Sequence, residues 1–183
     1  MVLIHHFRGL QPYLKWVVAF LIFPIGGLLG RLVADPSGSV IAALLVGAVA
    51  GAIIGAGQWL AMGRRAGEVR WIPATSMGLG VSFAAAQALG LSASSAAALG
   101  AVTGLGVGLA QFPLLTGRLA MPLIWVATTT VAWAVGWIIA SSIGVKTEAG
   151  WPVFGVSGAI VAQALTGLVL IGLGRPPRAR ELA

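Results

Sequence analysis

Long apolar runs alternate with short polar segments along the whole chain. A helix that crosses a lipid bilayer needs about 20 consecutive, mostly apolar residues. Six runs meet that length, and they cover Leu14–Val33, Val40–Met62, Trp71–Leu91, Ser94–Leu115, Pro122–Ile143 and Trp151–Leu173. The pattern therefore predicts an all-α polytopic membrane protein with six transmembrane helices joined by short loops.

The composition supports a membrane location for nearly the whole chain. Of its 183 residues, 58% are hydrophobic and only 8% are charged, and the mean hydropathy is +1.00. Soluble domains carry about 25% charged residues. Since the six runs leave little sequence outside them, we expect a single membrane domain over residues 1–183, ending in a short basic tail at 176–183.

The positions of lysine and arginine predict the orientation, because these residues are enriched in cytoplasmic loops. Two of the eleven, Arg31 and Lys146, fall on one side of the predicted spans. The other nine fall on the opposite side, namely Arg8, Lys15, Arg64, Arg65, Arg70, Arg118, Arg175, Arg178 and Arg180. We therefore expect both termini to be cytoplasmic in a bacterial cytoplasmic membrane. The net charge of +7 lies in short loops, so we expect the bilayer as partner and no nucleic acid.

An internal repeat follows from two residue types at regular intervals. Trp16, Trp71 and Trp125 lie near the starts of alternate runs, 55 and 54 residues apart, in "KWVVA", "RWIPAT" and "IWVAT". Gln58, Gln111 and Gln163 lie in the second half of the intervening runs, 53 and 52 residues apart. The spacing predicts three two-helix hairpins, at about 11–65, 66–118 and 119–175. Each hairpin crosses the membrane twice, so the repeats are parallel.

Glycines form a regular face on two of the runs. Gly47, Gly51 and Gly55 precede Gln58, and Gly100, Gly104 and Gly108 precede Gln111, in both cases at spacings of 4, 4 and 3. Eleven residues at about 100° each bring the glutamine back to the glycine face. Small residues let helix backbones approach closely in a membrane. We therefore expect these six glycines to form packing faces in a compact bundle.

The glutamines and tryptophans are the candidate polar sites. A carboxamide is costly to expose to hydrocarbon, so Gln58, Gln111 and Gln163 are expected to make hydrogen bonds between helices. The alternative is that they ring one shared polar site for a solute. Trp16, Trp71 and Trp125 are expected to anchor the helix ends in the lipid headgroup region, where tryptophan is enriched.

Catalytic and metal-binding patterns are weak. The stretch "FGVSGAIVA" resembles the serine motif of rhomboid intramembrane proteases, but the only histidines, His5 and His6, precede the first run. A serine without a positioned base is not an activated nucleophile. Cysteine is absent, and the four acids fall in loops or the tail, at Asp35, Glu68, Glu148 and Glu181. We therefore expect no enzyme activity and no catalytic, metal or cofactor-binding residue.

The segments "GAIIGAGQWL" and "GLGVGLAQFPLL" resemble a loose group of uncharacterised bacterial multi-span membrane proteins with repeated GxxxGxxQW hairpins. That resemblance implies a glycine-packed helical membrane protein and brings no settled activity. We expect a non-enzymatic accessory or assembly subunit. Its small-residue faces would pack against a second copy, another membrane protein, or a flat lipid or apolar pigment. The alternative is a permease or channel for a small neutral solute, of the kind of the six-helix substrate-binding components of vitamin importers.

Overall fold

The computed structural model describes residues 9–36, 38–63, 69–91, 95–115, 120–143 and 156–173. Within these ranges the chain is helical and contains no strand. The helices are α1 (Leu10–Val18), η1 (Ala19–Leu21), α2 (Ile22–Val33), α3 (Val40–Ala61), α4 (Trp71–Ala88), α5 (Ala96–Gln111), η4 (Phe112–Leu114), α6 (Ala120–Ser142) and α7 (Val156–Leu173). The expected basic tail at 176–183 lies outside these ranges.

Four helical segments are long and apolar enough to cross a membrane. They are Leu10–Val33, Val40–Ala61, Ala96–Leu114 and Ala120–Ser142, and Val156–Gly172 forms a shorter apolar helix. Large apolar side chains also cover the outside of the bundle, with Leu32 75% exposed, Ile41 72% and Met77 67%. Soluble monomers rarely expose large apolar surfaces. The expectation of an all-helical membrane protein is thus confirmed.

The first apolar run is one helical path with a change of helix type. The 3-10 turn η1 separates α1 from α2, and Pro24 lies in the first turn of α2. Proline has no N–H to donate to the carbonyl four residues earlier, which here belongs to Phe20, and its ring crowds that carbonyl. The tighter turn at Ala19–Leu21 therefore occurs where the proline disturbs the α-helical hydrogen bonds.

Two helix ends show local signals that the sequence encodes directly. At the start of α3, the Ser39 side chain accepts a hydrogen bond of 3.0 Å from the Ala42 N–H, as an N-cap does. At the end of α4, Gly90 adopts a φ of 65°, and the Leu91 N–H donates to the Ala86 carbonyl at 3.0 Å. This is a Schellman motif, which favours glycine because a residue without a Cβ adopts the left-handed conformation at no steric cost.

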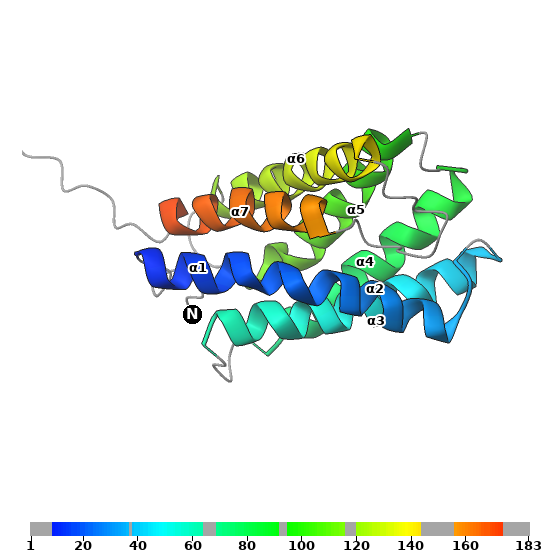
Figure 1. The fold of residues 1–183 in the computed structure, drawn as a ribbon, viewed down its shortest axis with the longest axis horizontal. Helices are drawn as coiled ribbons and strands as arrows, with labels where there is room; N and C mark the ends of the chain where they lie inside the picture. The colour runs from blue at the N-terminus through cyan, green and yellow to red at the C-terminus, as the bar shows by residue number, and fades with distance from the viewer. Residues whose placement is uncertain are drawn as a thin grey trace, which may run out of the picture.

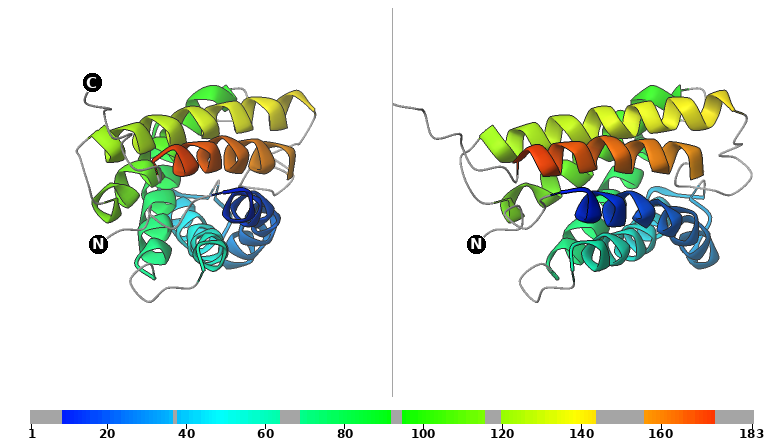
Figure 2. Two further views of the ribbon diagram at one scale, coloured as in Figure 1. Left: turned by 90° about the vertical axis from the view of Figure 1, so that its left-hand side faces the viewer. Right: turned by 60° about the vertical axis from the view of Figure 1, so that its left-hand side comes forward.

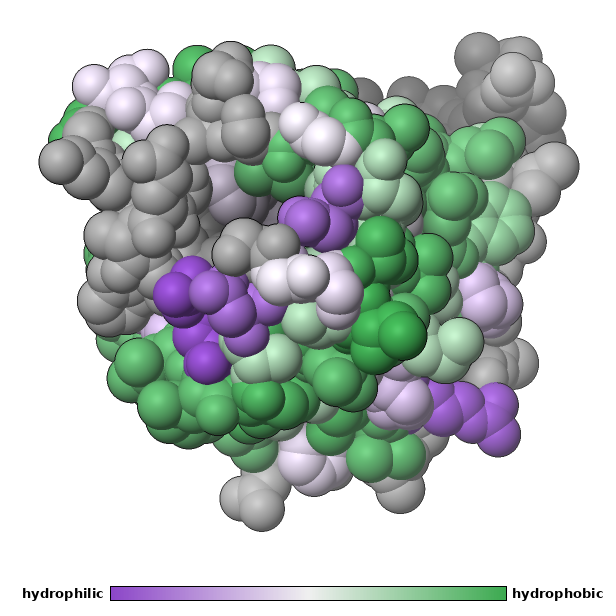
Figure 3. All heavy atoms as spheres, turned by 90° about the vertical axis from the view of Figure 1, so that its right-hand side faces the viewer, coloured by the Kyte–Doolittle hydropathy of each residue, from purple (hydrophilic) through white to green (hydrophobic). Residues whose placement is uncertain are grey.

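The helices form a closed series of neighbours. Each of α2 to α6 packs beside the next α-helix in the chain, and α7 returns to pack beside α1. Figures 1 and 2 show α1 running alongside α7, although the two are far apart in sequence. Figure 3 views the bundle from the end near the α2–α3 connection, where hydrophilic patches lie beside extensive apolar surface.

Glycine allows close approach at several of these contacts. An alanine Cβ at Gly30, Gly78 or Gly136 would lie 2.7 Å from a backbone atom of α3, α5 or α7, respectively. Distances below about 3.0 Å require one of the helices to move. The helix separation at these points therefore depends on the absence of a side chain, as expected where van der Waals packing holds membrane helices together.

Candidate functional site

Three tryptophans from different helices meet inside the bundle. Trp16 of α1, Trp71 of α4 and Trp125 of α6 are 0%, 0% and 1% exposed. Their ring centroids are 6.2, 6.2 and 5.7 Å apart, and two of the three pairs are edge-to-face. Aromatic pairs favour such separations and angles. The expectation of headgroup anchors does not fit this burial, because an anchor would lie on the outer surface.

Each indole N–H of this cluster has a side-chain acceptor. Trp71 Nε1 donates to Gln58 Oε1 at 2.8 Å, and Trp125 Nε1 donates to Gln111 Oε1 at 2.9 Å. Trp16 Nε1 donates to Thr166 Oγ1 at 3.0 Å. A tryptophan can serve as a core residue when its N–H finds such a partner, which explains why these three can be buried.

The structure brings two of the three candidate glutamines into direct contact. Gln58 Nε2 donates to Gln163 Oε1 at 3.1 Å, and Gln163 Nε2 donates to the Trp16 backbone carbonyl at 2.9 Å. Gln111 lies apart from this pair, and its Nε2 donates to Thr75 Oγ1 at 2.9 Å. All three glutamines are buried, at 5%, 2% and 1% exposure for Gln58, Gln163 and Gln111.

Threonines that the residue spacing did not mark as candidate site residues complete the polar network. Thr75 Oγ1 donates to the Trp71 carbonyl at 2.8 Å, and Thr129 Oγ1 donates to the Trp125 carbonyl at 3.0 Å. In both cases the threonine follows the tryptophan by four residues, which is one helical turn. The signal was present in "WIPAT" and "WVATT", but the spacing alone does not show that Thr75 also accepts from Gln111.

These bonds form one continuous chain through the interior, hereafter called the Trp–Gln network. In order it joins Thr166, Trp16, Gln163, Gln58, Trp71, Thr75, Gln111, Trp125 and Thr129. Consecutive hydrogen bonds that pass through one carboxamide or one hydroxyl polarise each other in a low-dielectric interior, and an unpaired group there is costly. The network therefore couples α1, α3, α4, α5, α6 and α7.

The chemistry of the Trp–Gln network is that of recognition and packing. Its side chains are indoles, carboxamides and hydroxyls, none of which titrates near neutral pH. No group of three or more His, Cys, Asp or Glu side chains that could hold a metal occurs in the described part of the chain. The network can therefore hold helices in a defined register, or offer hydrogen bonds to a neutral molecule that displaces its internal partners.

Comparison of the chain with protein-family models, with curated proteins and with solved structures gives no match.

The two expected glycine faces lie against neighbouring helices. An alanine Cβ at Gly47 would be 2.6 Å from the Leu79 carbonyl oxygen of α4, and one at Gly100 would be 2.6 Å from Ala134 Cα of α6. The other members follow the same division: Gly51 and Gly55 face α4 at Thr75, Ser76 and Ile72, while Gly104 and Gly108 face α6 at Val126, Thr129 and Trp133. These faces are therefore occupied within the chain.

The serine of the "GVSG" segment lies near the start of α7. Ser157 Oγ is buried and makes no hydrogen bond to the part of the chain that the structure describes. His5 and His6 lie outside that part. The structure thus places no base beside this serine among the residues it describes.

Proposed function

We propose that this protein is a non-enzymatic integral membrane accessory or assembly subunit, built from three two-helix hairpins with six spans. The recurring tryptophan is the main support for the hairpins. Trp71 and Trp125 each donate to a glutamine on the preceding helix, 13 and 14 residues earlier in the chain. Because the same contact recurs between the same kinds of helix, the hairpins at about 66–118 and 119–175 join their predecessors in the same way.

The interior supports a packing role rather than a transport role. The indole N–H groups and the carboxamides of the Trp–Gln network bond to partners within the network, so a solute would have to break buried hydrogen bonds to enter. Breaking one leaves a buried group unsatisfied, at about 1 to 3 kcal/mol each. Both glycine faces are also used within the chain. The outer apolar surface is then what remains for a partner, which we propose to be another membrane protein or a second copy.

Photo-crosslinking from the outer surface tests this role. A photoreactive amino acid is placed singly at Leu32, Met77 or Ile138, which are 75%, 67% and 44% exposed, and at Leu79, which is 0% exposed, as the control. The proposal predicts a crosslink to one defined protein from one outer face in native membranes, and only intramolecular products from Leu79. Lipid adducts alone at all outer positions would contradict an accessory role.

A flux assay separates the alternative. Purified protein in liposomes should not speed the entry of small neutral solutes above that of empty vesicles. Saturable flux that is lost in Gln58→Leu or Gln111→Leu, with folding retained, would instead support the permease or channel and count against the packing role.

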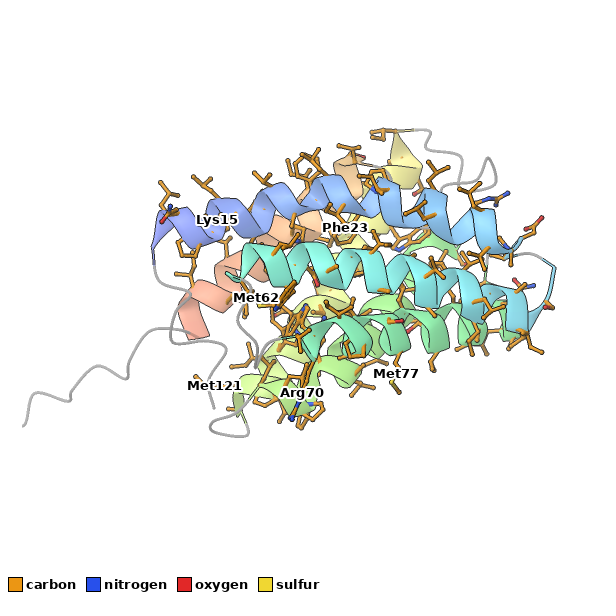
Figure 4. The ribbon with its side chains drawn as sticks, turned by 90° about the horizontal axis from the view of Figure 1, so that it is seen from below. Lys15, Phe23, Met62, Arg70, Met77 and Met121 are labelled. Atoms are coloured by element: carbon orange, nitrogen blue, oxygen red, sulfur yellow. The ribbon has the colours of Figure 1, made fainter. Side chains whose placement is uncertain are left out.

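We also propose that both termini are cytoplasmic in a bacterial inner membrane. Lys15 and Arg70 lie toward the same end of the bundle in Figure 4, in keeping with a basic cytoplasmic face. The chain contains no cysteine. Single cysteines at Val69 and Leu89, just beyond the two ends of α4, therefore report which side of the membrane each end faces, with no labelling of native cysteines. In intact cells an impermeant maleimide should label Leu89→Cys and spare Val69→Cys. Labelling of both, or the reverse, would refute this orientation.

A further inference from the structure

The contact between α7 and α1 differs chemically from its counterparts between α3 and α4 and between α5 and α6. In those two, a tryptophan bonds to a glutamine of the preceding helix. Between α7 and α1, the indole of Trp16 bonds to Thr166 instead, while Gln163 bonds to the backbone of Trp16. The last glutamine therefore does not occupy the place that its spacing in the sequence suggests.

The glutamine spacing aligns Gln163 with Gln58 and Gln111, and an alignment by the small residues that precede them accounts for the difference better. The spacing of 4, 4 and 3 that leads to Gln58 and Gln111 recurs in the last apolar run of the sequence when it ends on Thr166. The aligned sets are Gly47, Gly51, Gly55 and Gln58; Gly100, Gly104, Gly108 and Gln111; and Gly155, Ala159, Gln163 and Thr166. In this alignment Thr166 takes the same position as Gln58 and Gln111. The hydrogen bonds support the alignment independently, because each of these three residues accepts from a tryptophan indole N–H. Gln163 then matches Gly55 and Gly108.

The role of Gln163 follows from what Thr75 does in the next hairpin. Thr75 Oγ1 donates to the Trp71 carbonyl and accepts from Gln111 Nε2. The residue four positions after Trp16 is Phe20, whose side chain can do neither. Gln163 does both, because its Nε2 donates to the Trp16 carbonyl and its Oε1 accepts from Gln58 Nε2.

We infer that Gln163 is a positioning residue that supplies from α7 the polar group missing at Phe20, while Thr166 takes the acceptor position of Gln58 and Gln111. Gln163 thereby orients the Gln58 carboxamide, so that its oxygen faces the Trp71 indole. This role of Gln163 depends on its hydrogen bonds to Gln58 and Trp16 and is independent of the proposed accessory role.

The indole resonances of Trp16 and Trp71 distinguish this assignment from the one suggested by spacing. In 1H–15N spectra of the protein in detergent, each indole N–H is assigned with a tryptophan-to-phenylalanine variant. Thr166→Val should move the Trp16 indole proton upfield, as expected when a hydrogen bond is lost, and Thr166→Gln should keep it downfield. Gln163→Leu should leave the Trp16 indole bonded and perturb that of Trp71. The reverse pattern, with Trp16 responding to Gln163 and not to Thr166, would overturn the inference.

Rescue tests the substitution itself. Gln163→Gly should lower the thermal midpoint, since Gln58 Nε2 loses its acceptor in the interior. Adding Phe20→Thr to that variant should raise the midpoint, because a hydroxyl returns at the position equivalent to Thr75. Phe20→Val is the matched control, because valine has the shape of threonine without the hydroxyl, and it should not raise the midpoint. Equal effects of threonine and valine would refute the role of Gln163. If neither double variant accumulates, the Trp16 resonance in Thr166→Val decides the assignment.

Discussion

Replacing Gln58 by leucine removes a carboxamide that serves two partners at once. The Trp71 indole N–H loses its acceptor at 2.8 Å, and Gln163 Oε1 loses its donor at 3.1 Å. Hydrogen bonds between membrane helices contribute about 0.6 kcal/mol on average and up to about 1.7 kcal/mol, because the unfolded chain in the membrane also finds partners. Two bonds of this kind predict a loss of about 1 to 3 kcal/mol in the free energy of unfolding.

A double-mutant cycle isolates the bond between the two glutamines. Gln58→Leu and Gln163→Leu share one hydrogen bond, so their effects should couple by about 0.6 to 1.7 kcal/mol, the range for one such bond. Gln163→Leu with Gln111→Leu is the matched control, since no bond of the Trp–Gln network joins these two directly. Independent sites add within about 0.3 to 0.5 kcal/mol. The free energies come from reversible unfolding in mixed micelles of mild detergent and dodecyl sulfate, followed by circular dichroism.

Two results would refute this reasoning. A Gln58→Leu variant as stable as the parent would mean that the carboxamide makes no net contribution to the folded state. Equal coupling in the test pair and the control pair would mean that the glutamines act through a shared polar site rather than through the bond at 3.1 Å.

The remaining predictions concern close packing and the threonines. Gly100→Ala places a Cβ 2.6 Å from Ala134 Cα and should destabilise the bundle by about 1 to 3 kcal/mol through overpacking. Gly172→Ala, where the new Cβ has no atom within 4 Å, should be neutral or slightly stabilising. Thermal unfolding in detergent measures both variants, and equal effects would contradict the close-packing account. Thr75→Val removes the acceptor of Gln111 and should cost about 0.6 to 1.7 kcal/mol, the range for one bond between membrane helices. Thr130→Val should cost less, because its hydroxyl donates to the Val126 carbonyl in its own helix. An equal loss in the two threonine variants would show that the bond between helices contributes nothing.

The sequence by itself determined the helical membrane class and the positions of the small residues. Both depend on local information, because hydropathy over about 20 residues reports whether a segment can cross a bilayer, and helical periodicity reports which residues share a face. The four-residue spacing of glycine in "GAVAGAIIG" therefore identified Gly47, Gly51 and Gly55 as one helix face. It did not identify the helix that covers that face, which the structure places as α4.

Only the tertiary structure decided how the polar side chains pair. An indole N–H can donate to a lipid headgroup or to a buried carboxamide, and sequence spacing does not distinguish these two partners. Trp16, Trp71 and Trp125 were therefore expected on the outer surface, whereas they lie in the interior of the bundle. In the same way, Gln163 matches Gln58 and Gln111 in residue type, while Thr166 matches them in hydrogen bonding to an indole. The reason is that a hydrogen bond between helices depends on the rotation and axial position of both helices. At the contact of α7 with α1 the two partners come from opposite ends of the chain, where no local pattern relates them.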